Sequence, residues 1–237
     1  MILPKPFIVK IVENIKLTSR VRRIVLEFYG KKPIYLAGQF LMFDISDGVK
    51  RAYSIASAPE NGNRIKLFID ISPNGPASKF FTEVLVNAEC VITAPYGLFT
   101  LRDTNNDKIF ITASTGVAPV RAMLRDYFMN HNRPLNDTNP KFTLYFGVNK
   151  VEELFLVEEF RAMEEKYPNF KYIPVVLEPE TEWLGERGLV GDPYLRDETN
   201  FVDKDIYLCG SPKMVPAVKK QLLAKGVPEG NIYNERY

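Results

Sequence analysis

A change in hydrophobic periodicity near residue 104 constrains the fold of this chain most. Before this point, short apolar or alternating segments predict β-strands at 7–12, 22–28, 40–45, 51–57, 66–71 and 90–94. Glycine-containing turns separate these segments, as between the strands of an antiparallel sandwich or barrel. The number of segments favours a six-stranded antiparallel β-barrel.

Beyond residue 104, apolar strand segments alternate with helical ones. Strands are predicted at 109–112, 142–146, 172–177 and 206–209, and helices at 117–130, 152–166 and 214–225. This alternation is typical of a parallel α/β sheet. A polar stretch at 102–107 favours a domain boundary, so we expect an α/β two-domain protein divided into 1–103 and 104–237.

Composition excludes several classes of function. The net charge is +2, from 31 basic and 29 acidic residues, which gives no global attraction to nucleic acid or to an anionic membrane. Cys90 and Cys209 are the only cysteines, so the chain alone cannot build a four-cysteine iron-sulfur or zinc site, and no metal site is expected.

The sequence also bears on location and on side-chain catalysis. No leader-like segment or apolar run of membrane-spanning length is present, so we expect a cytoplasmic protein without membrane insertion. His131 is the only histidine and falls near a predicted helix end. Catalysis by a Ser-His or Cys-His pair would depend on this one residue, and a solvated helix-end histidine is the interpretation we favour.

A first cluster of chemically suited residues follows an apolar run. It consists of Arg51, Ala52, Tyr53 and Ser54. The guanidinium suits a phosphate, the aromatic face suits a flat ring, and the hydroxyl lies beside that ring. An edge-strand arginine with an aromatic neighbour is the alternative interpretation.

A turn and helix start come shortly afterwards, at Gly75, Pro76, Ala77 and Ser78. Proline suits the first helical turn, where its missing N–H costs nothing, and the neighbouring free N–H groups can bind phosphate oxygens. The alternative is that these residues only begin a helix.

A second cluster lies in the α/β half. Thr115, Gly116, Val117, Ala118 and Pro119 join a predicted strand to a helix, a context that can expose backbone N–H groups to a dinucleotide pyrophosphate. The segment matches neither the Gly-x-Gly-x-x-Gly fingerprint nor a P-loop. A tight connection that needs Gly116 for packing is the alternative.

Another strand-to-helix turn, at Cys209, Gly210 and Met214, would lie at the same carboxyl edge of a parallel sheet, where ligands bind. Cys209 can also be interpreted as a buried, small apolar residue.

Taken in this order, these motifs resemble the ferredoxin-NADP reductase superfamily of flavoprotein reductases over essentially the whole chain. The resemblance implies that residues 1–103 form a flavin-binding β-barrel and residues 104–237 an NAD(P)-binding α/β domain. It implies FAD, with FMN as the less favoured flavin, held through the Arg51 guanidinium at the flavin phosphate. Tyr53 would pack on the isoalloxazine ring and Ser54 would hydrogen-bond near flavin N5. Gly75, Pro76, Ala77 and Ser78 would form the flavin-pyrophosphate segment.

The resemblance also assigns the nicotinamide site. Thr115, Gly116, Val117 and Pro119 would hold the NAD(P) pyrophosphate, while Cys209, Gly210 and Met214 would border the nicotinamide. Tyr237 is similar to a terminal aromatic that covers the flavin until nicotinamide displaces it. Catalytic roles thereby fall to Ser54, Cys209, Glu235 and Tyr237. A frayed chain end is the alternative for Glu235 to Tyr237.

The chain departs from the family pattern at two places. Ala113-Ser114 replaces the usual Gly-Gly, which narrows the freedom of the backbone beside the pyrophosphate. Asn149 stands where NADP-preferring relatives often have arginine, and Lys150 follows it. NADH and NADPH therefore both stay open as donor.

The expected function is transfer of hydride from NAD(P)H to bound FAD, with electrons passing to an acceptor such as ferredoxin or flavodoxin. Basic residues at Arg20, Arg22, Arg23, Lys31, Lys32 and Lys50 could dock an acidic partner, or could be solvated surface charges. A free-flavin reductase and the reductase component of an oxygenase are alternatives. A non-catalytic, flavin-binding electron-relay subunit is an alternative of another class.

Overall fold

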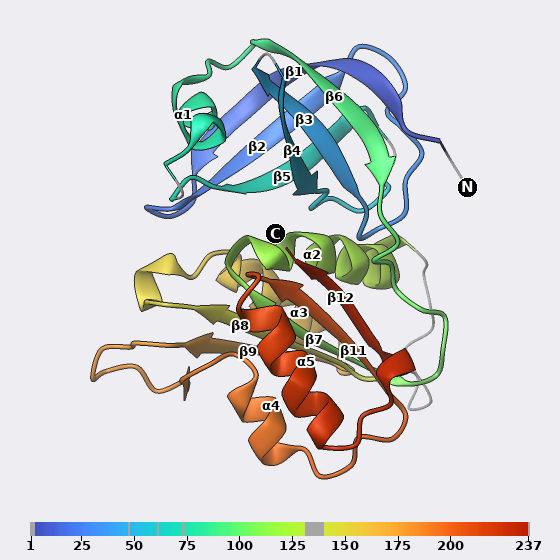
Figure 1. Cartoon of the computed structure of the whole chain (residues 1–237), viewed down its shortest axis with the longest axis vertical. Helices are drawn as coiled ribbons and strands as arrows, with labels where there is room; N and C mark the ends of the chain where they lie inside the picture. The colour runs from blue at the N-terminus through green and yellow to red at the C-terminus, as the bar shows by residue number, and fades with distance from the viewer. Residues whose placement is uncertain (1–2, 47, 61, 73, 131–139, 237) are drawn as a thin grey trace. The chain divides into compact units, whose positions relative to one another are not determined.

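Two separate six-stranded sheets organise the chain (Figure 1). The computed structural model describes residues 3–46, 48–60, 62–72, 74–130 and 140–236. One unit comprises the chain up to Leu101 together with the segment that begins at Ala118, and the other comprises Arg102–Val117 and the remainder of the chain. The expected division at residue 103 stays a prediction.

The first sheet is antiparallel and has the strand order β4-β3-β6-β1-β2-β5. Its elements are β1 (Lys5–Lys16), β2 (Val21–Phe28), β3 (Phe40–Ser46), β4 (Val49–Ser54), β5 (Arg64–Asp70), α1 (Pro76–Glu83) and β6 (Glu89–Tyr96). The six predicted strands are thus confirmed. Register shifts in the β1–β2, β3–β4 and β3–β6 pairs help the sheet to curl.

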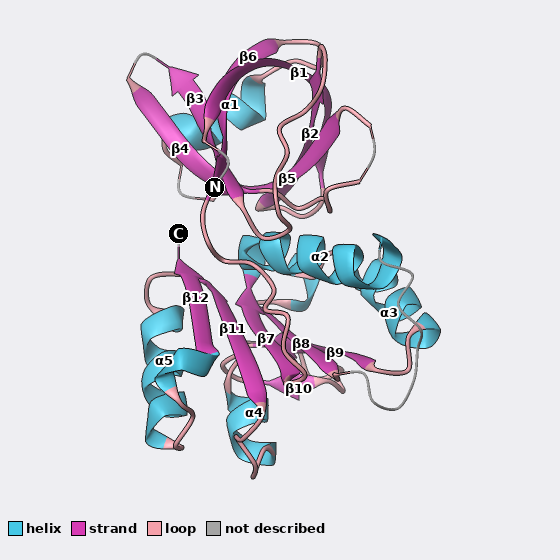
Figure 2. Cartoon of the chain, turned by 90° about the vertical axis from the view of Figure 1, so that its right-hand side faces the viewer, coloured by secondary structure: helices cyan, strands magenta, loops and turns pink. Residues whose placement is uncertain are grey.

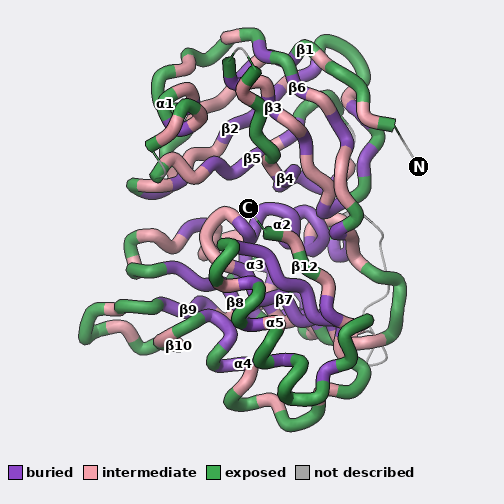
Figure 3. The backbone as a smooth tube through the Cα atoms, in the orientation of Figure 1, coloured by how far each residue is buried: buried purple, intermediate pink, exposed green. Residues whose placement is uncertain are grey.

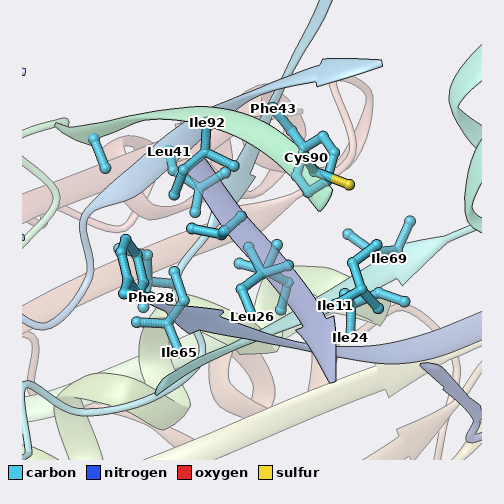
Figure 4. Close-up of a cluster of buried hydrophobic side chains, with 14 of the residues drawn as sticks. Ile11, Ile24, Leu26, Phe28, Leu41, Phe43, Ile65, Ile69, Cys90 and Ile92 are labelled. Carbon is cyan, nitrogen blue, oxygen red and sulfur yellow. The ribbon is translucent and has the colours of Figure 1, made fainter. Parts of the chain in front are cut away.

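Period-two alternation explains why these segments form strands around one core. Ile24, Leu26 and Phe28 of β2 are almost fully buried, and their inward positions match those of Ile65 and Ile69 on β5 (Figure 4). Successive strand residues point to opposite faces, so one face of each strand supplies the core. The expectation of an N-terminal barrel domain rests on this pattern.

The second sheet is parallel and has the order β10-β9-β8-β7-β11-β12. Its strands are β7 (Asp107–Ala113), β8 (Phe142–Val148), β9 (Phe170–Val176), β10 (Glu186–Arg187), β11 (Lys204–Gly210) and β12 (Ile232–Arg236). The central strands are buried along most of their length (Figure 3). Such continuous burial is expected where a parallel sheet is covered on both faces.

Helical segments connect the parallel strands. They are η1 (Ser114–Gly116), α2 (Val117–Arg125), η2 (Asp126–Asn130), η3 (Val151–Glu153), α3 (Val157–Lys166), α4 (Asp192–Asp197), α5 (Met214–Ala224) and η4 (Glu229–Asn231). α3 lies on one face of the sheet, and α4 and α5 lie on the other (Figure 2). Phe160 of α3 packs against Tyr172 of β9, with 5.2 Å between ring centroids. α5 contributes Val218 and Leu222 to the core on the opposite face.

The helices in the described part of the chain are short, and α5 contains 11 residues. None of them combines the length and the apolar character needed to cross a bilayer.

Two predicted features of the second half differ from the structure. The helix predicted at 152–166 begins only at Val157, because Leu156 has a φ of 62° and interrupts the helical path. The frayed-end interpretation is wrong for Glu235 and Arg236, since both pair with β11 as part of β12. The expectations for His131 and Tyr237 concern positions outside the described residues.

The turn between β9 and β10 is held by side-chain bonds to its own backbone. Arg187 donates to the carbonyl oxygens of Glu180, Thr181 and Trp183. The indole nitrogen of Trp183 donates to the Glu186 carbonyl oxygen at 3.0 Å. A Cβ atom on Gly185 would lie 2.5 Å from the Trp183 ring, so this position requires glycine.

A buried polar network joins the starts of β7 and β11. The Lys108 ammonium lies 2.8 Å from an Asp205 carboxylate oxygen, and both side chains are 1% exposed. Thr104 and Asn106 also donate to Asp205, and Lys108 donates to the Thr104 carbonyl oxygen at 2.9 Å. Because each buried charge has hydrogen-bonding partners, the network fixes the segment that leads into the parallel sheet.

We expect Asp205→Asn to lower the free energy of unfolding by ~3–5 kcal/mol, since removal of one member of a buried pair leaves the other charge uncompensated. Urea unfolding at pH 7 measures this loss. Lys219→Gln breaks the exposed pair with Glu229 in the same unit and serves as the matched control, with little change expected. Equal effects of the two variants would contradict a special role for the buried pair.

The same carboxylate also predicts a pH dependence. Burial alone would raise the pKa of Asp205, but hydrogen bonds from Lys108, Thr104 and Asn106 outweigh it and leave the pKa below its usual value. Stability from this group is therefore present above about pH 4 and lost as the pH falls through the depressed folded pKa. Asp205→Asn should remove this part of the acid dependence.

Candidate cofactor sites

The residues of the first cluster become more buried along β4, from Arg51 to Ser54. Arg51 and Ala52 are exposed, Tyr53 is half-buried, and Ser54 is only 4% exposed. The Arg51 guanidinium donates to the neighbouring Lys50 carbonyl oxygen at 2.9 Å. The arrangement leaves a cation at the surface and a hydroxyl at the edge of the core, on one short strand.

Aromatic packing fixes Tyr53 against α1. Its ring meets Phe81 edge-on, with 5.4 Å between centroids, and Phe43 of β3 contacts both rings. Burial raises the pKa of Tyr53 to about 12 despite the opposing charge of Arg51, so its hydroxyl stays protonated at neutral pH. Tyr53 therefore links the Arg51 strand to the helix whose start forms the other half of this predicted site.

The start of α1 has the features of an anion site. Pro76 occupies the first turn, and no side chain caps the helix or places a carboxylate in that turn. The first internal bond runs from Lys79 N–H to the Gly75 carbonyl oxygen, which leaves the N–H groups of Ala77 and Ser78 without helical acceptors. A Cβ atom on Gly75 would meet no atom within 4 Å, so the approach is open. These donors fit a phosphate group.

In the second unit, the structure brings two predicted turns together at the carboxyl edge of the sheet. A Cβ atom on Gly116 would lie 2.3 Å from the Cys209 carbonyl oxygen, and one on Gly210 would lie 2.9 Å from the Met214 sulfur. Glycine at 116 is therefore required for packing, as the alternative interpretation holds. The close approach also sets η1 beside the end of β11.

The backbone of the η1 turn is unusual for its sequence. Ser114 has a φ of 50°, in the left-handed region that glycine adopts more easily. Thr115 is half-buried, whereas Val117 and Pro119 are buried. Of this segment, Thr115 thus retains partial access to solvent.

Cys209 itself is 0% exposed at the end of β11, where its backbone pairs with Glu235 of β12. Its burial fits the interpretation of a small apolar residue. Glu235 is half-buried at the same level of the sheet. The catalytic roles expected for Cys209 and Glu235 stay predictions, and Tyr237 lies outside the described residues.

Sequence reasoning missed a carboxylate in the turn after β8. The Glu153 carboxylate accepts the Asn149 N–H at 3.1 Å, just beyond β8, and the Asn149 carbonyl oxygen accepts the Glu178 N–H at 2.9 Å. From the sequence, Glu153 falls inside the helix predicted at 152–166 and has no role of its own.

Most of the basic residues considered for docking have partners within the first unit. Arg20, Arg23 and Lys50 each form an ion pair with a carboxylate of that unit. Lys32 donates to the Glu60 carbonyl oxygen. These contacts support the interpretation of surface charges satisfied by their neighbours.

Comparison with known proteins identifies both halves. Residues 8–101 match the oxidoreductase FAD-binding domain, and residues 110–220 match the oxidoreductase NAD-binding domain. A probable flavin reductase of Aliivibrio fischeri is 32% identical over 195 residues, which cover 80% of this chain and 79% of the relative. The chain belongs to the ferredoxin-NADP reductase superfamily.

Two further proteins are similar to this chain over almost its whole length. The electron transfer component of anthranilate 1,2-dioxygenase from Acinetobacter baylyi is 28% identical, over 95% of this chain and 65% of the relative. The crystal structure of a cytochrome P450 reductase from Amycolatopsis superposes with a TM-score of 0.89 at 22% identity, over 98% of this chain and 70% of that one. The chain spans about half to two thirds of the length of the first curated relatives.

Arg51→Ala should weaken FAD binding roughly 10- to 100-fold, as expected for loss of a charge-assisted hydrogen bond. Titration of the apoprotein with FAD, followed by flavin fluorescence, measures the change. Lys50→Gln removes the neighbouring cation and is the matched control, with unchanged affinity expected. Equal FAD affinity in Arg51→Ala and wild type would rule out the phosphate role.

Gly116→Ala should separate η1 from β11, because the added Cβ would overlap the Cys209 carbonyl oxygen. We expect a loss of ~1–3 kcal/mol in unfolding free energy, as for overpacked sites, together with weaker nicotinamide nucleotide binding. Urea unfolding and nucleotide titration measure the two effects. Gly230→Ala, where an added Cβ meets no atom within 4 Å, is the control. A fully stable Gly116→Ala variant would disprove the packing argument.

Proposed function

We propose that this chain is an NAD(P)H-dependent flavoprotein reductase that accepts a hydride from the nicotinamide and delivers electrons to a separate acceptor. The observation that carries the proposal is the match to an FAD-binding and an NAD-binding oxidoreductase domain in one chain. The open, uncapped start of α1 and the interlocked turns at Gly116 and Cys209 fit the two ligands.

In the first unit, the Arg51 guanidinium and the N–H groups of Ala77 and Ser78 would hold the FAD phosphates. When bound there, FAD would supply the two-electron redox chemistry of the reaction. Tyr53, fixed by Phe81, would support the flavin ring through its face. The Ser54 hydroxyl would hydrogen-bond the flavin near N5, where charge and protonation change during reduction.

In the second unit, backbone N–H groups at Thr115 and Gly116 would bind the dinucleotide pyrophosphate. Met214 and the backbone of Cys209 and Gly210 would border the nicotinamide. Because Cys209 is fully buried, we assign its thiol a packing role at this border and no nucleophilic step. No side-chain nucleophile is needed when the cofactors carry the chemistry.

We infer that NADH is the preferred donor. In dinucleotide-binding sheets, a carboxylate near the adenosine ribose hydrogen-bonds the 2′-hydroxyl, whereas arginine accommodates a 2′-phosphate. In the turn after β8, the Glu153 carboxylate accepts a hydrogen bond from the Asn149 N–H. Lys150 is an exposed cation in the same turn. The carboxylate would repel a 2′-phosphate and favour the free hydroxyl.

Two classes of acceptor fit different relatives. The dioxygenase component and the P450 reductase support a protein acceptor, either a ferredoxin or flavodoxin or an oxygenase. The probable flavin reductase, most of whose length this chain covers, supports free flavin as the second candidate.

Cys90 and Cys209 are both buried and form no disulfide, which supports a cytoplasmic location.

Anaerobic titration of the FAD-loaded protein with NADH and with NADPH tests the proposal. Rapid loss of flavin absorbance with NADH and slower loss with NADPH is expected, and Glu153→Gln should narrow the difference. A flavin reduced by dithionite but by neither nucleotide would indicate an electron-relay subunit instead. Turnover with added free FMN, compared with turnover on ferredoxin, then identifies the acceptor class.

A further inference from the structure

A cavity of about 190 Å³ in the first unit is lined mainly by basic side chains. It lies among β5, the segment between β4 and β5, and the helix that begins at Val117, most of which belongs to this unit. Its charged lining consists of Lys32, Arg64, Lys66, Arg121, Arg125 and Glu60. Five cations and one carboxylate line the cavity. Arg125 pairs with Glu60, and Arg64 pairs at 2.8 Å with Glu27, which is not a lining residue, so the lining keeps an excess of positive charge through Lys32, Lys66 and Arg121.

The cations are held in place by the fold. Arg121 is 4% exposed, donates to the Ala56 carbonyl oxygen at 2.6 Å, and lies over the Phe68 ring. Arg125 forms a 2.9 Å ion pair with Glu60. The guanidinium groups are therefore preorganised, which lowers the ordering cost of binding an anion.

Lys32 is partly desolvated at the pocket, where it donates to the Glu60 carbonyl oxygen. Burial lowers the pKa of Lys32, and the attraction of Glu60 offsets this only in part. A bound anion would compensate the partly desolvated ammonium.

Size limits the class of ligand. The cavity is smaller than the ~300 Å³ lower bound of ordinary small-molecule sites. Guanidinium groups match the oxygens of phosphate in bidentate fashion. Three arginines line the pocket, and each uses only part of its five N–H donors in the bonds to Glu27, Glu60 and the Ala56 carbonyl oxygen. We propose that this basic pocket binds a phosphate group, either as inorganic phosphate or as part of a small phosphorylated metabolite.

The basic pocket is distinct from the cofactor sites assigned above. Its lining includes neither Arg51 and Tyr53, nor the start of α1, nor Thr115 and Gly116. A phosphate between Arg121 on α2 and Lys66 on β5 would tie the helix to the barrel. Because α2 follows directly on η1, occupancy would stabilise the segment that leads out of the nucleotide-binding turn.

The test is the thermal unfolding midpoint of the FAD-loaded full chain, measured against inorganic phosphate at constant ionic strength set with chloride. A saturable rise is expected for wild type. Lys66→Gln and Arg64→Gln should each weaken the apparent phosphate affinity roughly 10-fold or more. Lys16 is exposed at the C-terminal end of β1 and does not line the pocket. Lys16→Gln is therefore the matched control and should respond like wild type.

Three results would overturn the proposal. The first is an equal rise of the unfolding midpoint with chloride or acetate and with phosphate, and the second is an unchanged phosphate response in both pocket variants. The third is loss of the phosphate response in Arg51→Ala while Lys66→Gln retains it. The last would place phosphate in the flavin site. Glucose 6-phosphate, added in place of inorganic phosphate, distinguishes a free ion from a phosphorylated metabolite. The assay needs no turnover, so its outcome is independent of the proposed reductase activity.

Discussion

The close approach of Gly116 to the Cys209 carbonyl oxygen is the contact on which the carboxyl edge of the parallel sheet depends. It joins the turn after β7 to the turn after β11, two neighbouring strands that are far apart in sequence. Any side chain at 116 would separate them. Packing requires glycine at this position, and the predicted binding of a pyrophosphate would require the same, since the ligand needs close access to the backbone.

The predictable part of the fold is the part encoded locally. Alternating apolar residues in β2 and β5 define strands without reference to the rest of the chain. β12 was missed because Ile232–Arg236 has little apolar pattern, and its structure depends on pairing with β11. α3 was predicted too long because the positive φ of Leu156 is not visible in its residue type. Among the predicted site residues, Arg51 and Pro76 are singled out by their chemistry. The contacts of the Cys209 carbonyl oxygen and of the Glu153 carboxylate depend on the three-dimensional structure and leave no signal in the sequence.

The arginines of the first unit differ in their exposure and in their partners. Arg51 is exposed on β4 at the predicted flavin phosphate position, while Arg121 is buried and held by a carbonyl oxygen and an aromatic ring. Arg20 and Arg23 form ion pairs within the sheet. The net charge of +2 does not reveal this local arrangement, in which five cations line one cavity.

The ordered turn between β9 and β10 makes the second unit separately observable. Trp183 is the only tryptophan of the sequence, and its indole is fixed by the Glu186 carbonyl oxygen and by close contact with Gly185. Tryptophan emission consequently comes from the α/β unit alone, while far-ultraviolet circular dichroism records both sheets. A comparison of the two signals during denaturation would reveal whether the barrel and the α/β unit unfold as one cooperative body or in succession.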